Sequence, residues 1–349
     1  MTDPRLSRRN LLAGAAVGGG ALLATTLPGV ASADPASTDG RSVRPRKLVP
    51  GDRVRLVSPG GPPIHERVDL GKAMLESWGL VVELGDHALG SFGYLSAPDA
   101  DRLADLNDAF ADPDVRAVLA TRGGYGTGRI VDGIDYDAVR ADPKLVLGYS
   151  DITALHLALW KEARLATVHG PMIAWNESLN GPITGPIATA LKAALMTTAP
   201  TVIRRDPAIP TSGVEVAGKA TGRLLGGNLS LLVQEPRRAN APDTAGAIIV
   251  LEDVDEEPYR VDGMITQLLR DGWFDDVAGV ALGTFVNSVG EPGEWTVLDV
   301  LADRLKPLGV PVLGGLPVGH DVKPLTVPLG TSATLDTKAG TLTVTSAAS

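Results

Sequence analysis

The serine at position 150 stands where a nucleophile would be expected. The apolar residues 145–149 predict a strand, and a helix is predicted to start at Asp151. A serine on such a sharp strand-to-helix turn projects its hydroxyl away from the sheet, at a helix N-terminus whose N–H groups favour developing negative charge. The G-x-S-x-G pattern is incomplete, because Ile152 stands at its last position. Taken alone, the turn favours helix capping by Ser150 or Asp151, since capping serines outnumber nucleophiles.

A serine nucleophile needs a histidine base and a carboxylate that orients the base. Of the five histidines, His320 is the best placed, because it follows an apolar strand and the glycine-rich residues 314–319. His65 and His87 are expected in exposed loops, and His156 in a helix where it faces away from Ser150. His169 could either pack in the core or line a pocket.

Glu252 is the carboxylate whose position best suits the third role. It ends the predicted strand 247–251, and open α/β sheets hold their sites at the carboxyl ends of strands. The acids within 252–257 also suggest a metal site, but they lack calcium-loop spacing and a neighbouring histidine. A solvated acidic loop explains Asp255 and Glu256. The sequence therefore predicts no metal, and the absence of H-E-x-x-H disfavours a metallopeptidase.

The glycine-rich residues 122–128 have a different chemical use. They lack both G-x-G-x-x-G and the Lys-Ser/Thr of a phosphate-binding loop, so no nucleotide cofactor is indicated. Glycine lets backbone N–H groups turn inward without a side chain in the way. We expect this loop to approach a substrate or an oxyanion closely.

The elements that must position these residues change character along the chain. Strands alternate with helices in the first half, which implies parallel pairing and an α/β layered domain. The proline-punctuated residues 200–216 predict a linker between domains at 47–199 and 217–349, the second of them α+β with an antiparallel end. The strands are expected at 53–57, 80–84, 115–121, 145–149, 247–251 and 278–285, the helices at 68–78, 97–110, 151–163, 261–270 and 295–305, and a hairpin around 338–340.

The N-terminus has the layout of a signal peptide. Arg8 and Arg9 precede an apolar run, residues 11–27, and Ala31-Ser32-Ala33 offers the small residues that a signal peptidase recognises. We predict a Tat-type signal over 1–33, cleaved near Ala33, then a flexible lead-in over 34–46 and export to the extracellular, cell-wall or periplasmic space. The run is too short and glycine-rich for a stable membrane anchor. Removing three Arg and one Asp leaves 29 basic and 40 acidic residues, a net charge of −11.

The composition excludes several classes of protein and site. The 349 residues suffice for two domains and a substantial core. Without cysteine there can be no disulfide, thiolate zinc site, iron–sulfur cluster, cysteine nucleophile or lipoprotein anchor. The net charge of −9 argues against a nucleic-acid partner.

Seven short segments together resemble the LD-carboxypeptidase family (serine peptidase family S66, muramoyltetrapeptide carboxypeptidases). They occur in the expected order over roughly residues 47–335: Val57–Pro59, Thr121–Gly126, Gly148–His156, Gly226–Leu229, Leu251–Asp253, Glu257–Arg260 and Gly319–His320. The resemblance implies Ser150 as nucleophile, Glu252 as acid and His320 as base. It also implies a Rossmann- or flavodoxin-like N-terminal domain, a C-terminal α+β domain with a mixed sheet, and an active site in the cleft between them.

The implied reaction releases the terminal D-alanine of a peptidoglycan stem peptide without a cofactor. The N–H of Asp151 and one from Gly123 or Gly124 would form the oxyanion hole. Arg122 and Arg260 are the candidates for holding the terminal carboxylate, because an arginine fork suits that geometry. Either could instead pair with nearby acids.

Two features depart from the family, and alternatives stay open. Gly263 stands where many relatives have Arg, and the Tat-type signal, which implies the Tat export machinery as a partner, is unlike the cytoplasmic members. A hydrolase of acyl-aminoacyl nucleotides, like the microcin C immunity peptidases, is one alternative, and an exported solute- or wall-peptide-binding protein without catalysis is another. Relatives are often dimers, so a homodimer is compatible with the resemblance.

Overall fold

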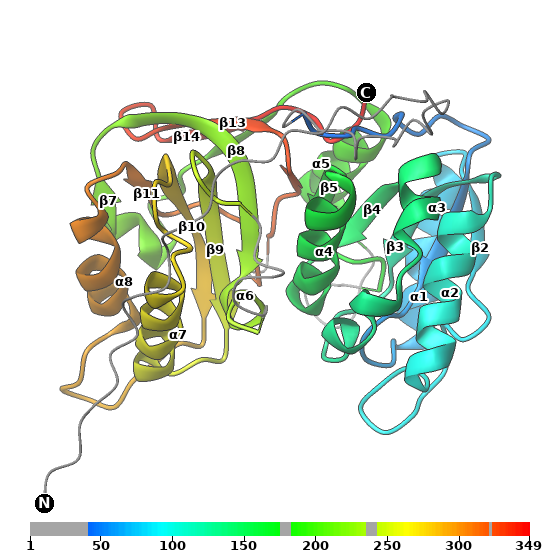
Figure 1. Cartoon of the computed structure of the whole chain (residues 1–349), viewed down its shortest axis with the longest axis horizontal. Helices are drawn as coiled ribbons and strands as arrows, with labels where there is room; N and C mark the ends of the chain where they lie inside the picture. Colours follow the sequence, from blue (N-terminus) through cyan, green and yellow to red (C-terminus); the bar gives the residue numbers. More distant parts are fainter. Residues whose placement is uncertain (1–40, 175–182, 235–242, 321–322) are drawn as a thin grey trace, which may run out of the picture. The chain divides into compact units, whose positions relative to one another are not determined.

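The computed structural model describes residues 41–174, 183–234, 243–320 and 323–349. These ranges build two sheets flanked by helices (Figure 1). The predicted signal peptide and its cleavage point lie outside the described residues. None of the helices in these ranges combines the length and the apolar character that a membrane crossing requires.

The first sheet has the strand order β12-β5-β4-β3-β1-β2. Its pairings are parallel, apart from the antiparallel pair of β12 and β5. Its strands are β1 (Arg53–Val57), β2 (Val81–Leu84), β3 (Val115–Ala120), β4 (Leu145–Gly148), β5 (Thr167–His169) and β12 (Val327–Leu329). The order β2-β1-β3-β4-β5 is flavodoxin-like, with its topological switch point between β1 and β3. The predicted parallel α/β sheet is confirmed.

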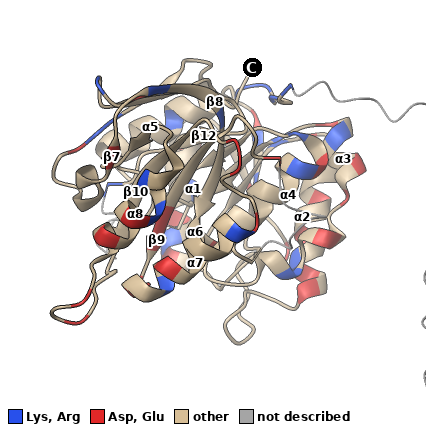
Figure 2. Ribbon diagram, turned by 60° about the vertical axis from the view of Figure 1, so that its left-hand side comes forward, with Lys and Arg blue, Asp and Glu red and all other residues tan. Residues whose placement is uncertain are grey.

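Helices cover both faces of this sheet because both faces are apolar. Leu145 and Leu147 enter one core together with α1 (His65–Ser77) and α5 (Gly185–Met196). Val146, between them, enters the other core with α2 (Asp99–Ala111), α3 (Tyr136–Ala141) and α4 (Thr153–Ala163). Successive strand residues point to opposite faces, so a run that is apolar throughout must be covered on both sides. In Figure 2 the charged residues lie largely on helices and loops, α2, α3 and α7 among them.

The second sheet is mixed, as predicted for the second half. Its order is β6-β14-β13-β8-β9-β10-β11-β7, parallel from β8 to β11 and antiparallel elsewhere. The helices α6 (Leu229–Leu232), α7 (Pro258–Arg270) and α8 (Val297–Leu305) share a core with β9 and β10. The strands are β6 (Thr201–Arg204), β7 (Glu215–Val216), β8 (Lys219–Asn228), β9 (Ile248–Val254), β10 (Gly279–Val286), β11 (Val312–Leu313), β13 (Ser332–Asp336) and β14 (Thr341–Val344).

Two segments differ from their sequence-based expectation. Residues 200–216, expected as a linker, contain β6 and β7, which form the two edges of the second sheet. Such short edge strands tolerate the neighbouring prolines that suggested a linker. Within the expected lead-in, residue Val43 donates its N–H to Arg164 O and accepts from Ala166 N, so this end is tied to the fold.

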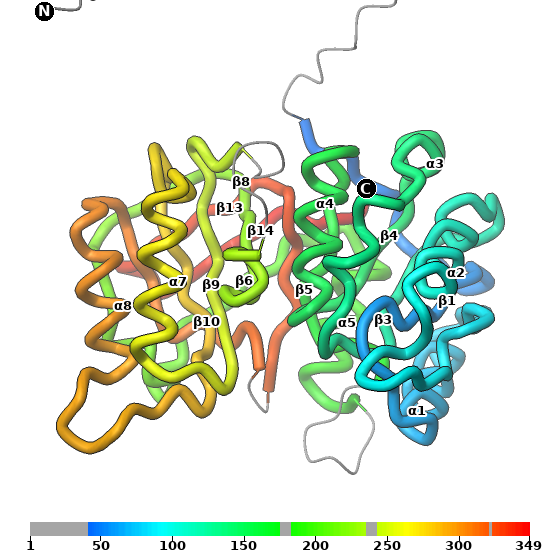
Figure 3. Tube along the Cα trace, turned by 60° about the horizontal axis from the view of Figure 1, so that its bottom comes forward, coloured from blue at the N-terminus to red at the C-terminus, as the bar shows by residue number. Residues whose placement is uncertain are grey.

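The strand β12 joins the two halves of the chain. It comes from the C-terminal half but pairs with β5 of the first sheet through Val327 and His169. In Figure 3 the orange-red segment that leads into β12 runs beside β5. The loop before β12 carries His320, so this crossing brings that loop to the carboxyl edge of the first sheet.

Candidate active site

Ser150 lies on a strained turn between β4 and α4. Its φ is +60°, a left-handed conformation that costs a non-glycine residue about 1–2 kcal/mol. A Cβ on Gly148 would lie 2.6 Å from the Ile152 side chain, so the strand can only end this tightly with glycine there. Tyr149 and Ile152 occupy the N-cap positions of the 3₁₀ turn and of α4, and neither makes a side-chain cap. The turn is therefore not explained by capping.

The glycine loop after β3 lies directly against this turn. A Cβ on Gly123 would be 3.2 Å from the Ser150 Cβ and 3.4 Å from the Asp151 N atom. Gly123 O accepts from Gly61 N, and a Cβ on Gly60 would lie 2.5 Å from that same oxygen. The backbone can approach the serine this closely because these positions carry no side chain. The glycine loop therefore lies against the serine turn, while its approach to a substrate and the oxyanion-hole role of Asp151, Gly123 and Gly124 stay predictions.

The Asp151 side chain joins the glycine loop to the serine turn. Its carboxylate accepts from Gly126 N (3.2 Å), Thr127 N (2.9 Å) and Thr127 Oγ1 (2.6 Å). Burial raises the pKa of Asp151, although these hydrogen bonds oppose the shift. Sequence reasoning used only the backbone N–H of this residue. The side chain fixes the distance between two backbone segments that must act together.

His320 and Glu252 form a hydrogen-bonded pair. The His320 Nδ1 donates to Glu252 Oε2 at 2.7 Å, and Glu252 is buried at the end of β9. Burial pushes the pKa of Glu252 up, but the charge and hydrogen bond of His320 outweigh it and hold that pKa below its usual value. Burial likewise pushes the pKa of His320 down, yet the charge of Glu252 and its hydrogen bond raise it above the usual value. Because Nδ1 is occupied, Nε2 is the ring nitrogen left for chemistry.

Glycine and an aromatic ring place this pair beside the serine turn. Gly319 has φ +110°, and a Cβ there would lie 2.5 Å from Glu252 Oε2. The His320 ring lies 4.7 Å, between centroids, from the ring of Tyr149, the residue before Ser150. The structure thus places the His320–Glu252 pair beside the turn that carries Ser150. Their catalytic roles stay a prediction.

A cavity of about 480 Å³ opens at this place. It is lined from both halves of the chain, by Ile64, Arg67, Thr121, Arg122, Gly123, Gly124, Tyr149, Met172, Ala174 and His320. A larger cavity of about 950 Å³ follows the loop between β10 and α8, and its lining includes none of the three predicted catalytic residues. The smaller cavity is therefore the candidate active site.

The two arginines predicted to bind substrate lie in different places. Arg122 lines the cavity and donates to Pro62 O at 2.7 Å. Arg260 is exposed on α7, 3.8 Å from Glu256, and is absent from the cavity lining. Arg67 of α1 also lines the cavity, although nothing in its local sequence indicates a role in substrate binding. Of the two predicted arginines, the geometry favours Arg122.

The other four histidines are absent from the lining of this cavity. His65 is exposed and bonded to Leu89 O, and His87 pairs with Asp105 at 2.9 Å. Burial lowers the pKa of His156 to about 3 and that of His169 to about 4. Within the described ranges, no three acidic or histidine side chains converge to hold a metal ion.

Asp253 is the buried acid next to Glu252. It accepts from Asn228 Nδ2 (3.0 Å) and from Ser230 N (2.9 Å), which joins β9 to the end of β8. Burial and the adjacent charge of Glu252 raise the pKa of Asp253 to about 7. The solvated acidic loop predicted for Asp255 and Glu256 begins beyond Asp253, with Asp255 exposed and Glu256 half-buried.

Comparison with known families covers most of the described chain. A model of the LD-carboxypeptidase N-terminal domain matches residues 54–170, and one of the C-terminal domain matches residues 221–335. A Bacillus subtilis protein named "Probable murein peptide carboxypeptidase" is 38% identical over 84% of this chain and 92% of its own. The murein tetrapeptide carboxypeptidase of Pseudomonas aeruginosa is 29% identical over 81% and 93%.

Solved structures share the fold. The muramoyltetrapeptide carboxypeptidase from Oxalobacter formigenes superposes with a TM-score of 0.72 at 28% identity, over 84% of this chain and 97% of that one. The wild-type microcin C7 self-immunity protein MccF has a TM-score of 0.77 at 23% identity, over 87% and 98%. At that identity, the second similarity concerns the fold alone.

Proposed function

Because the chain belongs to the LD-carboxypeptidase family of serine peptidases, we propose that it releases the terminal D-alanine from peptidoglycan tetrapeptides with Ser150, His320 and Glu252 as its triad. The observation that carries the proposal is the 2.7 Å bond between His320 Nδ1 and Glu252 Oε2, in a loop that shares a cavity with the strained serine turn. That bond leaves the Nε2 atom of His320 to act as the base.

Acylation begins at the serine. As Ser150 Oγ attacks the carbonyl carbon before D-alanine, His320 Nε2 takes its proton, and Glu252 stabilises the imidazolium. The carbonyl oxygen becomes an oxyanion, which the N–H of Asp151 and one from Gly123 or Gly124 would bind. One such donor contributes about 2.7–4 kcal/mol in other serine hydrolases.

Collapse of this intermediate breaks the C–N bond. His320 gives its proton to the departing amine of D-alanine, and the rest of the peptide stays on Ser150 as an ester. Water then attacks the ester with His320 again as base, which frees the shortened peptide and restores the serine hydroxyl. No metal or redox group enters this balance.

A carboxypeptidase must also recognise the free carboxylate of its substrate. Arg122 lines the cavity beside Gly123, so its guanidinium is the group we assign to this contact. Arg260 keeps the weaker claim, because its position on α7 would require it to leave Glu256 and reach the cavity.

The substrate would be met outside the cytoplasm. We propose export by the Tat machinery and cleavage near Ala33, on the support of Arg8-Arg9 and the apolar run that follows. N-terminal sequencing of the secreted protein tests this, and retention of Met1 would contradict it.

The activity is tested with the mature protein and tetrapeptides that contain L-lysine or diaminopimelate. We expect D-alanine release by the wild type and none by Ser150→Ala, with the circular dichroism spectrum preserved. A parallel assay with an acyl-aminoacyl nucleotide tests the activity of the microcin C immunity type. Turnover only of that substrate, tight peptide binding without turnover, or full activity in Ser150→Ala would each overturn the proposal.

A further inference from the structure

Several buried polar atoms on Glu252, His169 and Thr326 have no part in the mechanism above. Among the described residues, Glu252 Oε1, Thr326 Oγ1 and both ring nitrogens of His169 are buried without a hydrogen-bond partner. Leaving one buried polar group unsatisfied costs about 1–3 kcal/mol, and native proteins rarely leave several together. The charge of Glu252 acts on the His169 ring, so the unpaired atoms of these two side chains indicate an arrangement kept for function.

The backbone places His169 at the junction of the two halves. As the last residue of β5, it pairs with Gly148 of β4 on one side and with Val327 of β12 on the other. A Cβ on Gly170 would lie 2.8 Å from Thr326 Oγ1, so Thr326 packs against the same strand end. His169 thus sits between the strand that leads to Ser150 and the segment that follows His320.

The rings show the same proximity. The Tyr149 ring lies 5.9 Å from the His169 ring and 4.7 Å from the His320 ring, so both imidazoles contact one aromatic side chain. Burial lowers the pKa of His169 to about 4 even though the charge of Glu252 acts to raise it. His169 is therefore neutral near pH 7, with one N–H donor and one acceptor nitrogen.

We propose that His169 is a positioning residue that donates a ring N–H to Glu252 Oε1, directly or through one internal water, while Thr326 Oγ1 pairs with its other nitrogen. Both routes place the same donor against Oε1, the oxygen that His320 does not bind. The Asn228 side chain, whose hydrogen bonding also lowers the pKa of Glu252, is unchanged by substitution at His169. The carboxylate would then be held at both oxygens, ionised and oriented toward His320 Nδ1. This inference rests on the proposed triad and adds a fourth member that touches neither substrate nor serine.

The electrostatic consequence has a definite sign. A neutral donor on Oε1 draws charge from the carboxylate and makes it a weaker partner for the His320 imidazolium. Without that donor, Glu252 stabilises the imidazolium more, and the pKa of His320 rises. His320 is the base only when neutral, so the acid limb of kcat/KM moves to higher pH.

Other charges around these groups are constant in the comparison. His169 faces Glu252 and His320, with His156 of α4 at 6.3 Å between ring centroids. His320 faces Glu252, Asp253 and Asp255. None of these is altered by substitution at position 169.

The test uses His169→Phe, which keeps a ring of similar size but removes both nitrogens. We expect kcat/KM for D-alanine release to fall about 10- to 100-fold, as when other buried partners of active-site ligands are removed. We expect the acid limb, and the His320 pKa measured by NMR, to rise by about half a unit or more. His169→Asn and His169→Gln place an amide N–H near ring positions Nδ1 and Nε2, and one of them should restore the limb.

His156→Phe is the matched control. It removes a second buried imidazole, whose Nε2 bonds to Gly148 O at 2.9 Å, without touching Glu252. It should lower the melting temperature and leave the acid limb in place. If His169→Phe is too unstable to purify, the Asn and Gln variants and the NMR titration carry the test.

The outcomes separate this inference from the proposed function. A wild type that releases no D-alanine removes the proposed function. An active wild type, with the same acid limb and the same His320 pKa in every His169 variant, removes only the role of His169. A fall in kcat without a shift of the limb shows packing alone and overturns the inference as well.

Discussion

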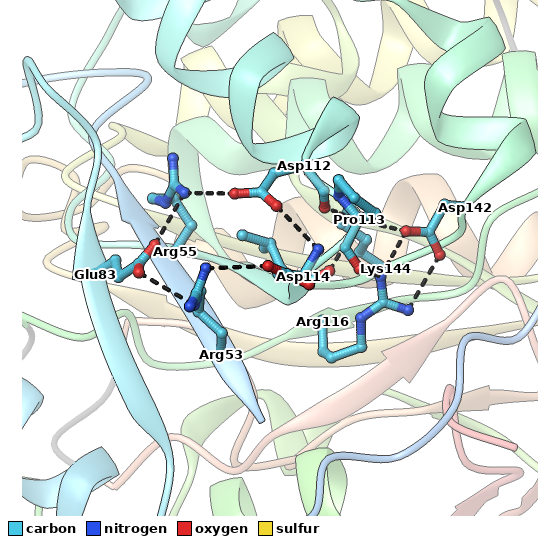
Figure 4. Close-up of polar contacts among 10 residues, drawn as sticks. Arg53, Arg55, Glu83, Asp112, Pro113, Asp114, Arg116, Asp142 and Lys144 are labelled. Carbon is cyan, nitrogen blue, oxygen red and sulfur yellow. Dashed lines mark hydrogen bonds and ion pairs between the residues drawn. The ribbon is translucent and has the colours of Figure 1, made fainter. Parts of the chain in front are cut away.

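The strands of the first sheet begin at one side of the sheet, here called the paired edge, and end at the other, here called the strained edge. The two differ in how their polar groups are satisfied. Around the starts of β1, β3 and β4, charged side chains form two groups of ion pairs, which the hydrogen bond from Lys144 Nζ to the backbone oxygen of Asp112 joins (Figure 4). Arg53 and Arg55 pair with Glu83 at 3.1 and 2.9 Å, and the buried Lys144 Nζ donates to Asp142 at 2.7 Å and to two backbone carbonyls. At this edge the charged groups are paired, with Arg55 Nε the buried atom left without a hydrogen-bond partner among them.

At the opposite edge the same strands end in strained or unpaired groups. β4 leads into Ser150 with φ +60°, β3 into a glycine loop, and β5 into His169 with both ring nitrogens unpaired. Local rules of satisfied polar groups and relaxed backbone fail together here. Proteins accept such violations where reactivity is required and offset them elsewhere. We therefore expect the paired edge to serve stability and the strained edge to serve chemistry.

The largest expected effect is at Ser150, where the comparison predicts that activity and stability oppose each other. Ser150→Gly and Ser150→Ala should each lower kcat/KM by about 1,000-fold or more, because both remove the nucleophile. Glycine accepts φ +60° without strain, so the glycine variant should be more stable than the alanine variant by about 1 kcal/mol. Urea denaturation and D-alanine release check both parts. Equal stability of the two variants would mean that the turn stores no strain.

The second effect is at the paired edge. Lys144→Met should lower the free energy of unfolding by about 1–3 kcal/mol, because it leaves Asp112 O and Val115 O buried without their donor. Asp142 keeps Arg116 as a partner, so the loss should not be larger. Denaturant midpoints measure it, and kcat/KM should equal that of the wild type. A fall in kcat/KM of the folded variant would show that the two edges are not independent.

Much of the difference between the two edges could be predicted from the sequence, because the residues that make it lie at the ends of recognisable strands. Strands that are apolar at every position required covering on both faces, which predicted the doubly wound first sheet. Parallel strands collect their carboxyl ends at one edge, so its position made Ser150 a candidate, although the turn alone favoured helix capping. Glu252 and His320 were selected in the same way, from the strand end or loop that carries each.

What the sequence could not show depends on neighbours distant along the chain. The short strand β12 pairs with β5, which lies more than a hundred residues earlier, and no local pattern indicates that pairing. The roles of the Asp151 side chain and of His169 depend on contacts with loops that only the fold brings near. Arg67 could not be selected either, because nothing in its local sequence distinguishes it from other helical arginines.

The third effect compares two arginines at opposite ends of β3, one within the strand and one just beyond it. Arg116 near the start of β3 pairs with Asp142, and Arg122 just after its end lines the cavity. Arg122→Ala should raise KM about tenfold or more through loss of a charge-assisted hydrogen bond, with little change in stability. Arg116→Ala should instead lower stability and leave KM unchanged. The reverse pattern in steady-state kinetics and thermal melts would contradict the division between the edges.

The smallest effect tests whether an ion pair at the strained edge contributes to stability as those at the paired edge do. His87, just after β2, bonds to Asp105, and this hydrogen bond raises the pKa of His87 above 6.5. A histidine whose folded pKa is raised adds stability that is fully present below the unfolded pKa and is lost as the pH rises through the folded pKa. His87→Asn should therefore lower the melting temperature at pH 5.5 but not at pH 8.5. Because His87 is 40% exposed, the loss should be well below that of Lys144→Met. An equal loss at both pH values would mean that His87 contributes packing rather than charge.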